Sequence, residues 1–190
     1  ISSGGGNIIL GGGTDITAGY ATGTSDTTFT YGIWLAGSNN LNSSGGAITL
    51  RGKSSNTSAA TSNWGVVVTN GTINAGAGKI AIDGIGLGSG SANAQGLTFN
   101  NVTIHSASAA ADAITLVGNA STTSNPYTSL GINYYGGGTI EATGGGGISV
   151  TGSAATAALY SSGVDISGNV LANSGNISIS GINTTPTAIG

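Results

Sequence analysis

A short motif of alternating apolar residues bounded by glycine recurs along the whole chain. It reads GGNIILGG at residues 5–12 and GGAITLRG at 45–52, and it returns with the same alternation at 77, 111, 145 and 174. Its first apolar position is always an isoleucine: Ile8, Ile48, Ile80, Ile114, Ile148 and Ile177. The average spacing of about 34 residues is typical of solenoid repeats, in which each unit packs on its neighbours.

Two further apolar columns lie between successive copies of this motif. A second column, Gly-apolar-x-apolar, occupies 32–35, 65–68, 96–99, 131–134 and 163–166. A third column follows it at Leu41, Ile73, Ile104, Ile140 and Leu171. Alternation with period two between turn residues predicts strands. The expected fold is therefore all-β: a parallel β-helix (β-solenoid) with three short strands per turn, about 34 residues per turn, and five to six turns.

The composition agrees with such a coil. Glycine accounts for 37 of 190 residues, whereas only 5% are charged and two are proline. Tight corners need the positive φ and the close backbone approach that glycine permits. Collagen would need far more proline, and a disordered linker would lack the recurring Ile, Val and Leu. We expect residues 1–190 to form one solenoid segment without an internal boundary, and, because neither end resembles a polar cap, to be an excerpt of a much longer chain.

Charge and hydropathy exclude several classes of partner. The basic residues are Arg51, Lys53 and Lys79, and the net charge is −3, so we expect no nucleic-acid partner. No stretch approaches the ~20 apolar residues of a membrane span, and we expect no membrane insertion by this segment. The expected partners are neighbouring solenoid turns or copies of the chain itself.

The repeat resembles that of a known class of exoproteins. The alternation of GGxIxLxG with Gly-apolar-x-apolar, followed by segments such as GTINAGAG (71–78) and GTIEATGG (138–145), is similar to the repeat regions of filamentous haemagglutinin-type proteins. These are large bacterial adhesins exported by two-partner secretion, and autotransporter passengers look similar. The resemblance implies a right-handed β-helix that is secreted or displayed on the bacterial cell surface, where it serves adhesion, biofilm formation or cell-to-cell contact.

The ionisable residues do not suggest a catalytic or metal site. Asp83, Glu141 and Asp165 fall on different strand columns, so we expect no carboxylate pair, no catalysis and no cofactor. His105 follows an apolar column position and is expected to face outward, without the companion ligands that a metal requires. Arg51 and Asp83 both stand three residues after a first-column isoleucine, which predicts a structural ion pair between consecutive turns.

Aromatic residues are the candidates for surface contact. Tyr31 and Trp64 each precede a second-column glycine, and Trp34 should point outward between Ile33 and Leu35. Tyr127 lies in a polar excursion at 119–130. Such side chains can stack on sugar rings or on a neighbouring molecule, which would make cell-surface glycans or proteins their ligands, or they can simply pack against the long loops.

Four functions compete. The leading hypothesis is a structural and adhesive shaft of a surface protein, and the runner-up is a self-assembling subunit of an extracellular filament or sheath. A polysaccharide-cleaving β-helix enzyme would need converging acids. An ice-binding solenoid would need a regular threonine ladder, whereas one outward row combines unlike residues: Trp34, Val67, Thr98, Asn133 and Asp165.

Overall fold

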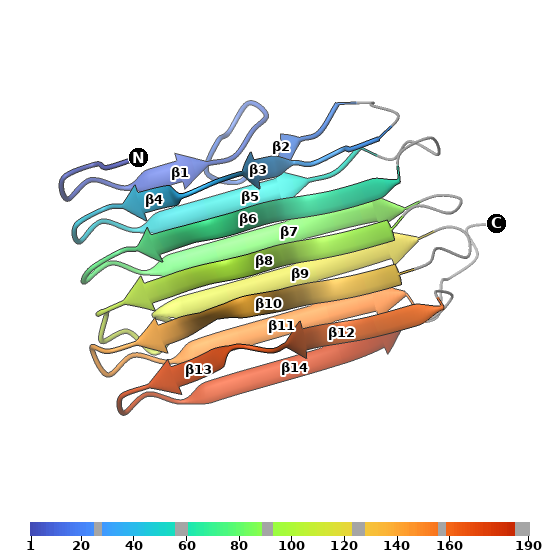
Figure 1. Ribbon diagram of the computed structural model, residues 1–190. Coiled ribbons are helices and arrows are strands. Elements are labelled where there is room, and N and C mark those ends of the chain that lie inside the picture. Colours follow the sequence, from blue (N-terminus) through green and yellow to red (C-terminus); the bar gives the residue numbers. More distant parts are fainter. Residues whose placement is uncertain (25–27, 56–60, 89–92, 123–127, 156–158, 185–190) are drawn as a thin grey trace.

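The chain folds into two parallel β-sheets that face each other. The computed structural model describes residues 1–24, 28–55, 61–88, 93–122, 128–155 and 159–184. Sheet 1 contains β1 (Ile8–Leu10), β2 (Ala21–Thr22), β5 (Ile48–Lys53), β7 (Ile80–Gly88), β9 (Ile114–Thr122), β11 (Ile148–Ala155) and β14 (Ile177–Thr184). Sheet 2 contains β3 (Ile33–Leu35), β4 (Asn39–Asn42), β6 (Ser62–Asn74), β8 (Asn93–Ser106), β10 (Thr128–Ala142), β12 (Tyr160–Ile166) and β13 (Asn169–Ala172). Figure 1 shows the sheets stacked face to face, with the strands of one running opposite to those of the other.

The predicted β-solenoid is confirmed, and the register follows the repeat. The six first-column isoleucines pair in order, from Ile8 with Ile48 to Ile148 with Ile177. The parallel strands stack in about four turns, with equivalent residues about 32 positions apart. The expected five to six turns is an overcount, because the first coil contains only short strands and the last described coil ends with β14.

The expectation of three short strands per turn is wrong for the central coils. There, the second and third columns lie in one continuous strand of sheet 2, as in β6 and β8. The expected corner is instead a bend at one residue with positive φ, namely Asn70 (φ 52°) and Asn101 (φ 53°). Asn101 Nδ2 donates a 3.0 Å hydrogen bond to Asn70 Oδ1, so the two bends are stacked. One left-handed residue changes the strand direction without ending the ladder of hydrogen bonds. Among the described strands of sheet 2, only those of the outer coils are divided in two, as β3 with β4 and β12 with β13.

The third column also contains one misassigned residue. Ile140 pairs with Val170, and Glu141 pairs with Leu171. Val170 therefore continues the inner column, whereas Leu171 faces outward and is half-exposed. Alternation alone does not decide which of two adjacent apolar residues points inward.

The core is a single apolar layer between the sheets. Its largest fully buried side chains come from both sheets: Tyr134, Phe99, Leu41, Ile48, Leu50, Ile73, Ile80, Ile82, Leu97, Ile104, Ile114 and Leu116. Phe99 and Tyr134 occupy adjacent positions of sheet 2, and their ring centroids lie 5.9 Å apart. Tyr134 is the largest of these residues, and its hydroxyl donates a hydrogen bond to the carbonyl oxygen of Val102.

Two ladders of glycine bring the sheets into backbone contact beside this layer. In sheet 1, Gly52, Gly84, Gly118, Gly152 and Gly181 pair in register. The facing glycines of sheet 2 are Gly65, Gly96, Gly131 and Gly163. A Cβ atom on any of the first four in sheet 1 would overlap with a glycine carbonyl oxygen of sheet 2, as Gly118 would with Gly131. None of the ladder glycines has a positive φ. These glycines are required because the opposite backbone leaves no room for a side chain, and not for a turn.

Candidate functional site

Four aromatic side chains gather on the outer face of sheet 2, at the end of the sheet that contains β3 and β6. We call Phe29, Tyr31, Trp34 and Trp64 the aromatic patch. Tyr31 lies at its centre: its ring is nearly parallel to that of Trp64 at a centroid distance of 5.1 Å, and it meets Trp34 edge-on at 5.3 Å. Phe29 lies 5.3 Å from Tyr31 on the remaining side. The three residues expected from the sequence therefore contact one another through Tyr31.

The patch combines packed and exposed rings. Trp34 is 57% exposed and Phe29 is 48% exposed. Tyr31 is more enclosed, and burial raises the pKa of its hydroxyl to about 12. Tyr31 thus acts as the support on which the exposed ring of Trp34 is oriented.

A strip of outward-facing residues continues from the patch across sheet 2. Strand register places Trp34 beside Val67, Val67 beside Thr98, and Thr98 beside Asn133. Val67 and Thr98 are only 2% and 1% exposed, although their chain neighbours point into the core. A side chain on an outer face is buried only where other side chains cover it. The large side chains of Trp64 and Gln95 lie in the adjacent row and provide this cover for Val67 and Thr98.

Hydrogen bonds organise the polar part of this strip. The Oε1 atom of Gln95 accepts from Thr98 Oγ1 at 2.6 Å and from Asn133 Nδ2 at 3.3 Å. Behind the patch, Thr30 Oγ1 donates to Asn63 Oδ1, and both side chains are buried. The indole Nε1 of Trp64 is buried without a hydrogen-bond partner among the described residues. Gln95 of the adjacent row therefore holds Thr98 and Asn133 of the strip in place.

The outer face of sheet 1 carries the ion pair that the sequence predicts. Arg51 Nη2 lies 3.2 Å from Asp83 Oδ2, and both side chains are about one quarter exposed. Tyr20, from the excursion between β1 and β2, covers the pair. Its hydroxyl donates to Asp83 Oδ2, and its ring lies 4.6 Å from Arg51 Cζ. A groove of about 230 Å³ lies beside them, lined by Thr49, Arg51, Ala81, Ile82, Asp83, Thr115 and Val117.

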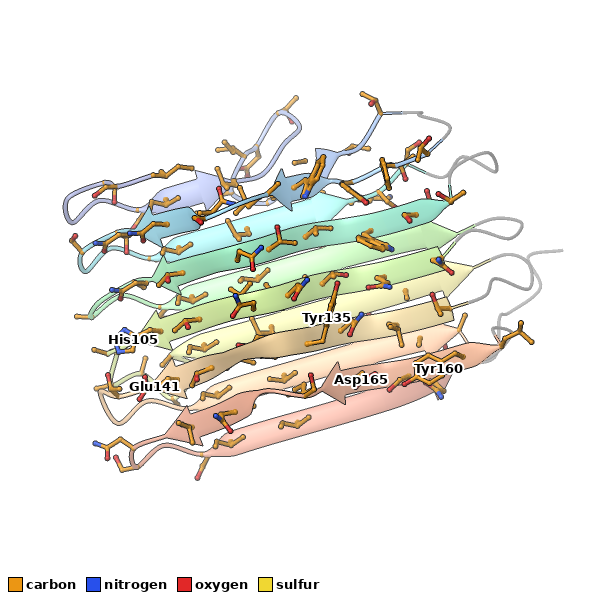
Figure 2. All side chains as sticks on the ribbon, in the orientation of Figure 1. His105, Tyr135, Glu141, Tyr160 and Asp165 are labelled. Atoms are coloured by element: carbon orange, nitrogen blue, oxygen red, sulfur yellow. The ribbon has the colours of Figure 1, made fainter. Side chains whose placement is uncertain are left out.

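The remaining candidates are separate from the patch. His105 and Glu141 are neighbours in register at one end of sheet 2, where Figure 2 shows both, and Tyr135 lies farther along the strands. The ring of His105 contacts Asn74 Oδ1 at 3.0 Å and Thr143 Oγ1 at 3.1 Å. Tyr160 donates to Asp165 at 3.0 Å. Tyr127 lies outside the described residues, as do parts of the polar excursions.

Within the described ranges, no three His, Cys, Asp or Glu side chains are grouped as a metal would require. The same ranges contain no helix long and apolar enough to cross a membrane.

Sequence reasoning missed two of the contacting aromatic residues. Phe29 stands two residues before Tyr31, so period-two alternation would have placed it on the same face. Tyr20 gives no such signal, because its excursion has no counterpart in the other units.

No protein-family model, no curated protein and no solved structure matches the chain.

Proposed function

We propose that this chain is part of the shaft of an extracellular bacterial surface protein, and that it mediates attachment to surfaces or contact between cells. The observation that carries the proposal is the stack of coils in register, in which six isoleucines occupy equivalent positions of one sheet. Such a column grows by repetition along one direction and presents long, flat outer faces. Its resemblance to filamentous haemagglutinin-type repeats supports the adhesive role.

The outer face of sheet 2 supports the same proposal. Trp34 and Phe29 of the aromatic patch are exposed, and the outward positions beside them, Val67, Thr98 and Asn133, are uncharged. Exposed aromatic rings set in a polar surface are common at contact sites. The shaft would thus serve both as a spacer and as a contact surface.

Attachment of coated beads to cells tests this function. Microspheres carrying the 190-residue chain should attach to at least one of a panel of bacterial and mammalian cells several-fold more than microspheres carrying albumin. Soluble chain should compete for this attachment. Equal attachment of both kinds of bead across the panel would contradict the adhesive role.

A self-assembling filament subunit is the second candidate, favoured by one observation. The inward isoleucines of the last described strand, Ile177 and Ile179 of β14, are about half exposed. A further coil, from a second copy, would bury them and pair the free edge of β14. Negative-stain electron microscopy of the purified chain tests this candidate, which predicts filaments longer than a single molecule.

A further inference from the structure

We infer that the aromatic patch, together with Asn133 at the far end of the strip, forms a binding site for a neutral glycan chain. The inference rests on the proposed adhesive function and identifies the class of ligand that the shaft would contact.

Trp34 presents an exposed ring whose orientation is fixed by its neighbours. More than half of this side chain is exposed, yet its ring is held by the edge-on contact with Tyr31, which is itself stacked on Trp64. An exposed ring that is fixed before binding loses little conformational freedom when a ligand covers it. The apolar C–H face of a pyranose ring matches such a flat aromatic surface.

An ordered polar group, Asn133, lies on the same face of sheet 2 as this platform, beyond the covered Val67 and Thr98. Strand register carries the row from Trp34 through Val67 and Thr98 to Asn133, in steps of about 4.8 Å per strand. Gln95 anchors Thr98 and Asn133 through its Oε1 atom. A glycan that stacks on Trp34 and runs across the strands would meet an ordered amide group at the far end of the strip.

The charges near the strip favour an uncharged ligand. Asp165, the first carboxylate in the row, lies one strand beyond Asn133 and accepts a hydrogen bond from Tyr160. Of the three basic residues in the chain, Arg51 and Lys79 pair with Asp83 and Asp112, and Lys53 ends β5 in sheet 1. The described part of the strip therefore offers no cation to an anionic ligand and no carboxylate to a cationic one, which favours a neutral ligand.

The exposed aromatic surface is small. Aromatic side chains bury about 150–250 Å² each, so two half-exposed rings present roughly 200 Å² of aromatic surface. A stable protein interface needs about 800 Å² per partner. The exposed rings are too small a surface to be the centre of such an interface, but they match one or two sugar rings.

Tryptophan fluorescence can report on this site directly. The chain contains two tryptophans, Trp34 and Trp64, and both belong to the patch. Cellohexaose, chitohexaose, maltohexaose and a heparin-derived hexasaccharide are titrated into the 190-residue chain, and the fluorescently labelled chain is applied to an array of neutral, sialylated and sulfated glycans. We expect a saturable change with at least one neutral glycan, and at least tenfold weaker binding by Trp34→Ala.

Matched variants test whether a loss of glycan binding is specific to the ring of Trp34. Tyr160→Ala removes an exposed aromatic residue of the same sheet away from the patch, and it should bind as the parent does. Trp34→Phe keeps an aromatic surface and should retain part of the affinity. Because Trp34 is exposed, its variants should keep the parent thermal transition, which circular dichroism checks.

Three results would overturn the inference: no neutral glycan bound on the array or in titration, binding that is unchanged in Trp34→Ala, or binding of sulfated and sialylated glycans alone. Sedimentation that reveals self-association dependent on Trp34 would also overturn it and assign the patch to a second copy. If beads carrying Trp34→Ala still attach to cells and no glycan binds, this inference alone is wrong. If beads carrying the parent chain do not attach to any cell, the proposed function is wrong.

Discussion

At the scale of single residues, Asp83 has an unusual number of partners for an outward position. Its Oδ2 atom accepts from Arg51 and from Tyr20, and the Arg51 guanidinium lies against the Tyr20 ring. These contacts connect β5, β7 and the excursion that precedes β2. The cluster therefore fastens the longest described excursion to the outer face of sheet 1.

Replacing Asp83 should loosen this attachment. We expect Asp83→Asn to lower the free energy of unfolding by about 1 kcal/mol, because the pair is partly buried and is supported by a cation–π contact. Urea denaturation followed by circular dichroism measures the change. Asp112→Asn is the matched control, since it breaks the exposed Lys79–Asp112 pair and should have no measurable effect. Equal stability of Asp83→Asn and the parent would contradict a stabilising cluster.

The repeat predicted the two charged members of this cluster but not the third. Arg51 and Asp83 occupy the same offset in consecutive units, so stacking the units was sufficient to bring them together. Tyr20 belongs to an insertion found in one unit, and no periodicity relates it to β7. The same reason explains why Tyr31, Trp34 and Trp64 could be nominated, while their mutual ring geometry could not.

Tyr134 makes stability dependent on alkaline pH. Burial raises its pKa from the ordinary value of 10.0 to about 12. A pKa that is higher in the folded chain means that the folded chain holds the proton more tightly. This contribution is complete below about pH 10 and is lost as the pH rises to about 12. Two pKa units correspond to roughly 3 kcal/mol.

We therefore expect the free energy of unfolding to fall between about pH 10 and about pH 12. Urea denaturation at several pH values measures this fall. Tyr134→Phe should make the decline shallower and, because the hydrogen bond to Val102 is lost, should cost about 1 kcal/mol at neutral pH. A decline of the same size in the variant would show that Tyr134 is not its source.

At the scale of elements, the glycine ladders determine how closely the sheets approach. Large apolar side chains fill the interior on one side of the ladders, whereas small ones such as Ser54, Ala120 and Ala154 are buried on the other. The sheets can meet there because the facing positions have no side chains. The repeat motif ends in glycine for this packing reason.

A methyl group in the ladder should be strongly destabilising. Gly118→Ala places a Cβ against the Gly131 carbonyl oxygen, and we expect a loss of about 3 kcal/mol or failure to fold. Gly181→Ala, at the open end of the same ladder, brings its Cβ only to 3.2 Å from Val164 N and should cost less. Gly6→Ala is the control, since its nearest atom lies at 3.7 Å and its φ is not positive. Thermal melts rank the variants, and equal melting temperatures would refute the steric explanation.

The strands themselves were predictable to different degrees. The registers of the sheets were predicted correctly from the six first-column isoleucines and from the alternation of the second column. A one-residue slip in register would turn apolar side chains to solvent. The merging of two columns into one strand was not predictable, since glycine and asparagine signal a bend without showing whether pairing continues through it. The role of the ladder glycines was equally hidden, because a turn glycine and a packing glycine look the same in a sequence.

At the scale of the whole molecule, the two ends of the described column differ. In the first coil, the inward Ile8 and Ile33 are 5% and 8% exposed, whereas in the last described strand Ile177 and Ile179 are 44% and 50% exposed. Among the described strands, β14 pairs with β11 alone. An exposed edge with an apolar side is a template for pairing with another strand.

We expect the 190-residue chain to self-associate in solution through this edge. Ile179→Lys should weaken the association at least tenfold, because the coil that covers β14 would have to bury the ammonium group. Ser178→Lys adds the same charge one residue away, on the opposite side of the strand, and should associate as the parent does. Sedimentation velocity over a concentration series measures both variants against the parent. If the parent chain stays monomeric at every concentration, or if the two lysine variants have equal effects, the β14 edge does not support filament formation. The single-chain shaft is then the better account.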